Sequence, residues 1–245
     1  MRPDENILYG GAVSGGAASG FSDDWLVDGV VNKPAKATTG TQTWTVTPLV
    51  AGTVDFIAVA NHNIDAARTI TIGGDVSATL AGPAARANGI NVNPWAQVSS
   101  VAGVDNITIG VSGNSSALTI GEFFAGKLRE SSYGMRVRTP FTPSYSGIRH
   151  ETDGGTALIY ELPFVRRGIS TSMGADDSDL EQFLAWFEAA RANTRPSVII
   201  PFDDQQDAWV VEFLRLTYEP ILYQSSSSAT YMVTMEFAEF PRYRF

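Results

Sequence analysis

The first half of the chain alternates short apolar runs with turn-forming residues, a pattern that is typical of β-strands. Residues 42–47 follow a period of two, with threonines on one side and Trp44 and Val46 on the other. Residues 53–60 form a nearly continuous apolar run, which suits a strand that is covered on both faces. Further candidates lie at residues 68–72, 107–111 and 117–125. Their spacing predicts a β-sandwich or jelly roll.

The second half of the chain combines strands with one amphipathic helix. Leu180, Phe183, Leu184 and Phe187 fall at i, i+3, i+4 and i+7, which places them on one helical face. Ser178 and Glu181 form an S-x-x-E capping box, and Pro196 prevents continuation, so we expect the principal helix at about 178–193. Strands are predicted at residues 156–172, 197–202, 208–216 and 230–237, and an extended loop is predicted at residues 139–147.

The character of the chain changes near residues 127–132. The three lysines all occur up to Lys127, and every later basic side chain except His150 is an arginine. We therefore predict a mainly β protein with two domains, an N-terminal β-sandwich over residues 1–128 and a C-terminal α+β domain over residues 129–245. In the second domain, one helix would lie against a small, mostly antiparallel sheet.

Composition and charge limit the classes of function. The 245 residues carry a net charge of −9, which disfavours contact with nucleic-acid phosphates, so no nucleic-acid readout is expected. The chain has no cysteine, which removes disulfides and thiolate nucleophiles. No window approaches 18 apolar residues, and residues 1–20 lack the long apolar run of a secretion signal. We expect no membrane span and synthesis as a soluble product.

No constellation of catalytic residues is evident. The sequence has neither a phosphate-binding G-x-x-x-x-G-K motif nor a G-x-S-x-G elbow with a later histidine. His62 and His150 are the only histidines, and neither has a second histidine at metal-ligand spacing. We therefore predict no catalytic residue, no metal site and no cofactor. Carboxylate pairs at residues 23–24, 176–177 and 203–204 keep a glycan-degrading enzyme as an alternative.

Four side chains of the first domain are candidates for glycan contact. Trp25 and Trp95 lie in polar segments that we predict to be loops, and exposed loop aromatics stack on sugar faces. The alternative is that each indole folds back onto the core. Asn61 and His62 directly follow the apolar strand at residues 53–60, at a place where ligand loops gather in sandwiches. The alternative for these two is a turn-capping role.

The C-terminus is unusually rich in aromatic residues. Phe237, Phe240, Tyr243 and Phe245 would be an aggregation hazard if they were exposed, so a partner surface would explain them. The alternative is that they fold back onto their own core. The tail is therefore a candidate subunit interface.

Two stretches resemble known families. Leu26-Val27-Asp28-Gly29, followed by Trp44-Thr45-Val46 and a strand that ends in Ala60-Asn61-His62-Asn63, resembles the discoidin or galactose-binding β-sandwich. Versions of this sandwich occur as modules of phage tail proteins, and loops at one of its ends bind sugars. The order of elements over residues 178–240 resembles the minor and distal tail proteins of long-tailed phages, in which such a domain assembles into a ring.

These resemblances imply a structural, non-enzymatic virion protein of a phage tail tip or baseplate. It would form a homo-oligomeric ring, a trimer or a hexamer, and would contact other phage tail proteins. It would be assembled in the host cytoplasm and carried on the virion tail. The N-terminal sandwich would face outward, where host surface glycans are expected partners. A stand-alone carbohydrate-binding module is the alternative.

Overall fold

The computed structural model describes residues 1, 5–82, 92–129, 136–137, 142–151, 157–193, 195–200, 207–221, 231–240 and 242–243. For residues 136–137, 142–151, 157–167, 193 and 242–243 it describes the backbone alone. The described chain is mainly β, with several antiparallel sheets and a single α-helix, which confirms the predicted fold class.

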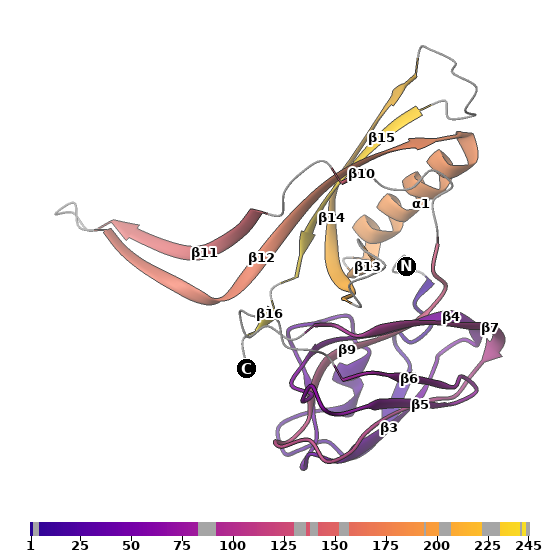
Figure 1. The fold of residues 1–245 in the computed structure, drawn as a ribbon, viewed down its shortest axis with the longest axis vertical. Coiled ribbons are helices and arrows are strands. Elements are labelled where there is room, and N and C mark those ends of the chain that lie inside the picture. The colour runs from indigo at the N-terminus through magenta and orange to yellow at the C-terminus, as the bar shows by residue number, and fades with distance from the viewer. Residues whose placement is uncertain are drawn as a thin grey trace.

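The N-terminal domain is a sandwich of two antiparallel sheets (Figure 1). The first sheet contains, in spatial order, β1 (Ala12–Ser14), β3 (Gln42–Thr47), β8 (Ile107–Val111), β5 (Ile70–Gly74) and β6 (Ala78–Leu80). The second contains β2 (Ala35–Lys36), β9 (Thr119–Gly126), β4 (Gly52–His62) and β7 (Trp95–Val104). Their inner faces meet in one core, whose fully buried side chains include Trp44, Ile57, Ile109 and Phe123. Burial of such side chains is the main stabilising contribution of this domain.

One strand of the sandwich differs from the sequence-based prediction. Trp95 lies at the start of β7 and pairs with Ala58, so its assignment to a loop was wrong. The residues that follow are small or polar apart from Val98, Val101 and Val104, and all of them except Val104 are intermediate or exposed at the border of the sheet. This edge strand has no apolar run from which it could be recognised.

The C-terminal domain is a seven-stranded antiparallel sheet with one helix. Five strands follow in the order β10 (Arg136–Val137), β12 (Ala157–Ala175), β15 (Tyr231–Glu239), β14 (Trp209–Pro220) and β13 (Ser197–Ile199), while β11 (Thr142–Glu151) and β16 (Arg242–Tyr243) also pair with β12. The helix α1 (Asp177–Asn193) contributes Trp186 and Phe187 to an aromatic cluster with Phe213 and Phe237. Their ring centroids lie 4.5 to 5.4 Å apart, which anchors the helix on the sheet.

The start of α1 shows a cap that lies two residues before the predicted one. The backbone N–H of Asp179 donates to Asp176 Oδ1 at 2.8 Å, and that of Leu180 donates to the Asp176 carbonyl at 2.9 Å. Asp176 is therefore the residue that caps the helix, and Ser178 lies in its first turn. The predicted helix itself is confirmed.

The strands β11 and β12 extend beyond the sheet as an arm, which we define as residues 142–151 and 157–167 (Figure 1). Strand β16 pairs with the arm at residues 164–165, whereas the outer part, residues 147–151 and 157–161, is two-stranded among the described residues. Residues 142–151 include part of the segment that was predicted to be a loop, and that prediction was wrong. Pro143 is compatible with the strand because, among the described strands, β11 pairs with β12 alone and so has one neighbour.

Candidate functional site

The two domains meet in a buried apolar seam. Its sandwich side includes Met1, Tyr9, Phe56, Ala58 and Phe124, and its C-terminal side includes Val198, Ala208 and Val210. The N-terminal ammonium of Met1 donates to the carbonyl of Val198 at 2.7 Å, and the Val198 N–H donates to the Met1 carbonyl at 3.1 Å. The beginning of the chain therefore pairs with strand β13 of the other domain.

Asn93, which lies just before β7, forms hydrogen bonds across the seam. Its side-chain Nδ2 donates to the Ala208 carbonyl at 3.0 Å, and its own carbonyl accepts from the Ala208 N–H at 2.8 Å. Its N–H donates to Asp207 Oδ1 at 2.9 Å, while its Oδ1 accepts from the N–H of Asn61. Asn93 is 3% exposed, so these bonds are shielded from water and fix the relative orientation of the domains.

Tyr9 and Arg195 form a second polar connection across the seam. The Tyr9 hydroxyl donates to the Pro196 carbonyl at 3.2 Å, and the Arg195 guanidinium carbon lies 4.7 Å from the centre of the Tyr9 ring. Burial is the main cause that raises the pKa of Tyr9 well above its ordinary value, with the charge of Glu122 adding to it. The phenol therefore stays protonated and able to donate.

Glu122 is a fully buried carboxyl beside this connection. Its two oxygens accept from the Gly29 N–H at 3.1 and 3.2 Å. Burial, followed by repulsion from Asp28, raises its pKa well above the ordinary value, against the opposing effects of the Gly29 N–H and Arg195. The burial of this carboxyl could have been predicted from the sequence, because Glu122 is the one charged residue in the apolar run of residues 118–125.

The structure does not bring the four candidate glycan residues together. Asn61 is 5% exposed and His62 is 1% exposed. The Asn61 Nδ2 donates to the Val31 carbonyl at 2.9 Å, and His62 Nδ1 accepts from the Ile64 N–H. Both side chains therefore have structural partners. Trp95 is half-buried at the seam, where its ring lies 6.0 Å from that of Phe56.

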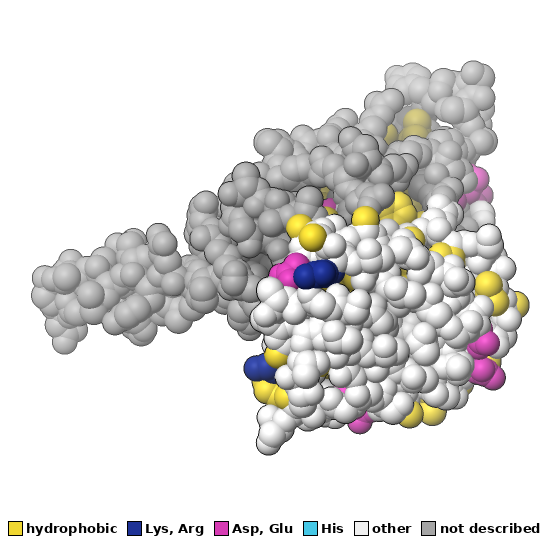
Figure 2. All heavy atoms as spheres, turned by 60° about the horizontal axis from the view of Figure 1, so that its bottom comes forward, with side chains coloured by type: hydrophobic (Ala, Val, Ile, Leu, Met, Phe, Trp, Pro, Cys, Tyr) yellow, Lys and Arg dark blue, Asp and Glu magenta, His cyan; other side chains and the backbone are white. Residues whose placement is uncertain are grey.

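Trp25 lies instead in a partly exposed aromatic group at the 3-10 helix η2 (Asp23–Leu26). Its ring packs edge-on against Phe21 at 5.7 Å. Lys33 Nζ lies 4.4 Å from the centre of the Trp25 ring, and Lys36 Nζ lies 5.1 Å from that of Phe21. We call these four side chains the aromatic–lysine group. On the side of the sandwich drawn in Figure 2, charged and apolar side chains are scattered and form no broad patch.

The C-terminal aromatic residues have different positions. Phe237 is 2% exposed and belongs to the core of its own domain, so its assignment to a subunit interface was wrong. Phe240 is partly buried and packs against the seam. The backbone of Tyr243 pairs with Phe164 in the arm, its side chain is not described, and Phe245 lies outside the described residues.

Two of the three carboxylate pairs have structural partners. Asp23 Oδ1 accepts from the buried Trp44 Nε1 at 2.9 Å, and its Oδ2 accepts from the Gly16 N–H at 2.9 Å. Asp24 accepts from the Val13 N–H, and Asp176 caps α1. The third pair, residues 203–204, lies outside the described residues.

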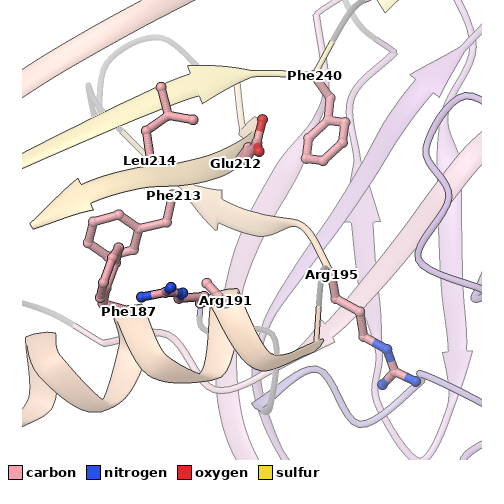
Figure 3. A pocket seen from close by; sticks show the side chains of 8 residues that line it. Phe187, Arg191, Arg195, Glu212, Phe213, Leu214 and Phe240 are labelled. Carbon is pink, nitrogen blue, oxygen red and sulfur yellow. The ribbon is translucent and has the colours of Figure 1, made fainter.

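A cavity of about 470 Å³ lies between α1 and β14 (Figure 3). Its apolar lining is Phe187, Ala190, Phe213, Leu214 and Phe240, and its charged lining is Arg191, Arg195 and Glu212. In Figure 3, Arg191 points into the cavity, whereas the Arg195 guanidinium points away from it. Within the described ranges, no group of three or more potential metal ligands occurs, and no helix is long and apolar enough to cross a membrane.

The sequence matches no protein-family model and no curated protein. The solved structures that this chain matches include SpGH29, with 16% identity and a TM-score of 0.41 over 52% of this chain and 29% of that one. A chitosan-binding module of a chitosanase/glucanase from Paenibacillus sp. IK-5 has 12% identity and a TM-score of 0.38 over 50% and 98%. A fucose-binding module of Streptococcus pneumoniae has 13% identity and a TM-score of 0.39, over 51% of this chain and 98% of that one. Carbohydrate-binding modules are thus among the structural neighbours, and likenesses of this size carry no argument about ligand or activity.

Proposed function

We propose that this chain is a structural protein of a phage tail tip or baseplate, whose C-terminal domain joins copies into a ring. The observation that carries the proposal is the arm of β11 and β12. Strand β11 pairs with β12 alone, and residues 157–161 of β12 pair with β11 alone, among the described strands. A two-stranded ribbon is marginally stable in water and offers unpaired N–H and C=O groups on both edges. Such an arm is stable when another chain covers it.

The seam supports a mechanical role for the same protein. Asn93, Tyr9 and the Met1–Val198 pairing fix the sandwich to the sheet that carries the arm. A fixed orientation lets an assembled ring present every sandwich in the same direction. Copies that contact each other head to tail, through two different surfaces, form a closed ring when successive rotations return to the first copy.

The experiment compares the whole chain with a variant whose arm is shortened. Ile148 lies opposite Tyr160, so replacing residues 149–159 with Asn-Gly closes the hairpin at that pair by a two-residue turn. Mass photometry and negative-stain microscopy should show rings for the whole chain and smaller species for the variant. An unchanged thermal unfolding midpoint serves as the control for folding. A whole chain that stays monomeric at micromolar concentration contradicts the proposal.

The aromatic–lysine group favours a second function, which is binding of surface glycans by the sandwich. Trp25 and Phe21 are both partly exposed, and the adjacent lysines supply donors for sugar hydroxyls. Aromatic faces with polar neighbours suit sugar rings. On a glycan array, we expect the whole chain to bind and Trp25→Ala to bind at least tenfold less. Leu49→Ala, which changes an exposed apolar side chain elsewhere on the sandwich, is the matched control. Equal signals from all three proteins would remove the glycan function.

A further inference from the structure

Glu122 faces the domain seam from strand β9. It lies two residues before Phe124, which belongs to the seam, and successive side chains of a strand point to opposite faces, so the two residues share a face. Their partners on β4, Ala60 opposite Glu122 and Ala58 opposite Phe124, also belong to the seam. The carboxyl is therefore directed toward the C-terminal domain and away from the core of the sandwich.

Arg195 of the C-terminal domain covers the turn to which Glu122 is hydrogen-bonded. A side-chain carbon added to Gly29 would lie 3.5 Å from Arg195 Cγ and 3.7 Å from Tyr9 Cε1, so both side chains pack on this glycine. The Arg195 guanidinium turns away from the cavity between α1 and β14 (Figure 3) and lies over the Tyr9 ring. The next residue, Pro196, accepts the hydrogen bond of the Tyr9 hydroxyl. The burial of Glu122 thus depends in part on how the two domains meet.

The surroundings of Glu122 favour a neutral carboxyl. Both of its oxygens accept from one donor, the Gly29 N–H, and no cation of the described residues forms an ion pair with it. Lys33 pairs instead with Asp28, at 3.6 Å. An unpaired charge on a side chain without exposed surface is strongly unfavourable, so the buried Glu122 holds a proton.

The charged and titratable groups around Glu122 come from three segments. Among the described residues they are Tyr9 before β1, Asp28 after η2 and Arg195 after α1, while β9 itself carries no second charged residue. Burial, followed by repulsion from Asp28, raises the pKa of Glu122, whereas the Gly29 N–H and Arg195 lower it. Release of the proton therefore places an anion in the seam. The one cation of the described residues that faces this anion, Arg195, also connects the domains through Tyr9.

We propose that the proton on Glu122 controls how firmly the C-terminal domain is attached to the sandwich. With the proton bound, the seam closes over a neutral side chain. Loss of the proton draws water to the carboxylate and loosens the contact between Arg195 and Tyr9, so the orientation of the sandwich is no longer fixed. Because opening releases the proton, the ratio of open to closed seam rises about tenfold for each pH unit between the ordinary glutamate pKa and the pKa in the closed state. The device acts within one chain, so it stands independently of ring formation and of glycan binding.

Spin labels on the two domains measure this opening. The chain has no cysteine, so Ser100→Cys on β7 and Ala185→Cys on α1, both at exposed positions, give one label in each domain. Double electron–electron resonance in a series from about pH 5 to about pH 9 should show one narrow distance population at the acidic end. A second, broader population should grow as the pH rises. Unchanged far-UV circular dichroism over the same series is the control for folding.

Substitutions in the labelled protein separate this proton from other causes. Glu122→Gln keeps an acceptor for the Gly29 N–H and cannot ionise, so its distance distribution should stay narrow throughout the series. Tyr9→Phe removes the hydrogen bond to Pro196 and should move half-opening to lower pH, by about one unit for each tenfold weakening of the seam. Tyr218→Phe, at an exposed tyrosine of β14, should leave the curve unchanged. A wild-type distribution that ignores pH, an equal response in Glu122→Gln, or opening only together with loss of secondary structure would overturn the proposal.

Discussion

Asn93 and Ala208 exchange two hydrogen bonds across the domain seam, although 115 positions separate them in the sequence. The Asn93 side chain donates to the Ala208 carbonyl at 3.0 Å, and the Ala208 N–H donates back to the Asn93 carbonyl at 2.8 Å. This pairing makes the sandwich and the C-terminal sheet one mechanical unit.

Removing the Asn93 amide should uncouple the domains. Asn93→Ala leaves the buried Ala208 carbonyl and Asn61 N–H without these partners, which costs about 2–4 kcal/mol of unfolding free energy. Urea unfolding followed by tryptophan fluorescence and by circular dichroism should give one shared transition for the wild type and two separate transitions for the variant. Asn106→Ala, at an exposed position, is the matched control. Coincident transitions in Asn93→Ala would show that the apolar contacts suffice to couple the domains.

The raised pKa of Glu122 predicts how the unfolding free energy depends on pH. Its pKa is raised in the folded state, so that state holds a proton at pH values where the unfolded chain has lost it. The stabilisation is complete below the ordinary glutamate pKa and is lost as the pH rises through the folded-state pKa. Unfolding free energy should therefore fall with rising pH across this window.

The variant Glu122→Gln tests the same group. The amide carbonyl still accepts from Gly29, and the side chain stays neutral at every pH. Urea unfolding at a series of pH values should give a shallower decline and a more stable protein at neutral pH. Glu188→Gln, on the exposed side of α1, should keep the wild-type slope. An unchanged slope in Glu122→Gln would mean that another group sets the pH dependence.

Asp23 should stabilise the sandwich through the indole of Trp44. Asp23→Ala removes the acceptor of the buried Trp44 Nε1–H and of the Gly16 N–H, at an expected cost of about 2–3 kcal/mol. Asp23→Asn keeps one acceptor oxygen and should recover part of this loss. Thermal unfolding of the three proteins measures the difference. Equal midpoints for Asp23→Ala and the wild type would assign this carboxylate no structural role.

The aromatic cluster under α1 should stabilise the C-terminal domain. Phe213→Ala deletes a ring that contacts three other aromatic side chains, and such a deletion costs about 3–5 kcal/mol. Proteolysis should then cut the C-terminal half preferentially and leave the sandwich intact. Leu214→Ala, on the neighbouring exposed position, should resist proteolysis like the wild type.

Elements with a clear apolar period could be predicted from the sequence. The helix followed from Leu180, Phe183, Leu184 and Phe187, and β3 followed from the alternation around Trp44. Strand β7 was missed because it lies at the edge of its sheet and lacks an apolar run. Strand β11 was missed because Pro143, Ser144 and Gly147 favour a loop. Apolar periodicity indicates which residues are buried, and only one residue of β7, Val104, is fully buried.

The domain seam could not be predicted from the sequence. Tyr9 and Pro196 are 187 positions apart, and their hydrogen bond depends on how the two finished domains meet. Phe237 was placed at a subunit interface because aromatic residues crowd the C-terminus, but the alternation of β15 turns it toward α1. The position of a side chain on one face of a strand depends on register, which a single sequence leaves open.

Amide hydrogen exchange of the arm tests the proposed assembly most directly. At concentrations where rings form, the backbone amides of the outer part of the arm, residues 147–151 and 157–161, should exchange as slowly as those of β14 and β15. Dilution to the monomer should make the amides of this outer part exchange fast while β15 stays protected, because the outer part alone is a two-stranded ribbon. Fast exchange of the arm at every concentration would contradict the account.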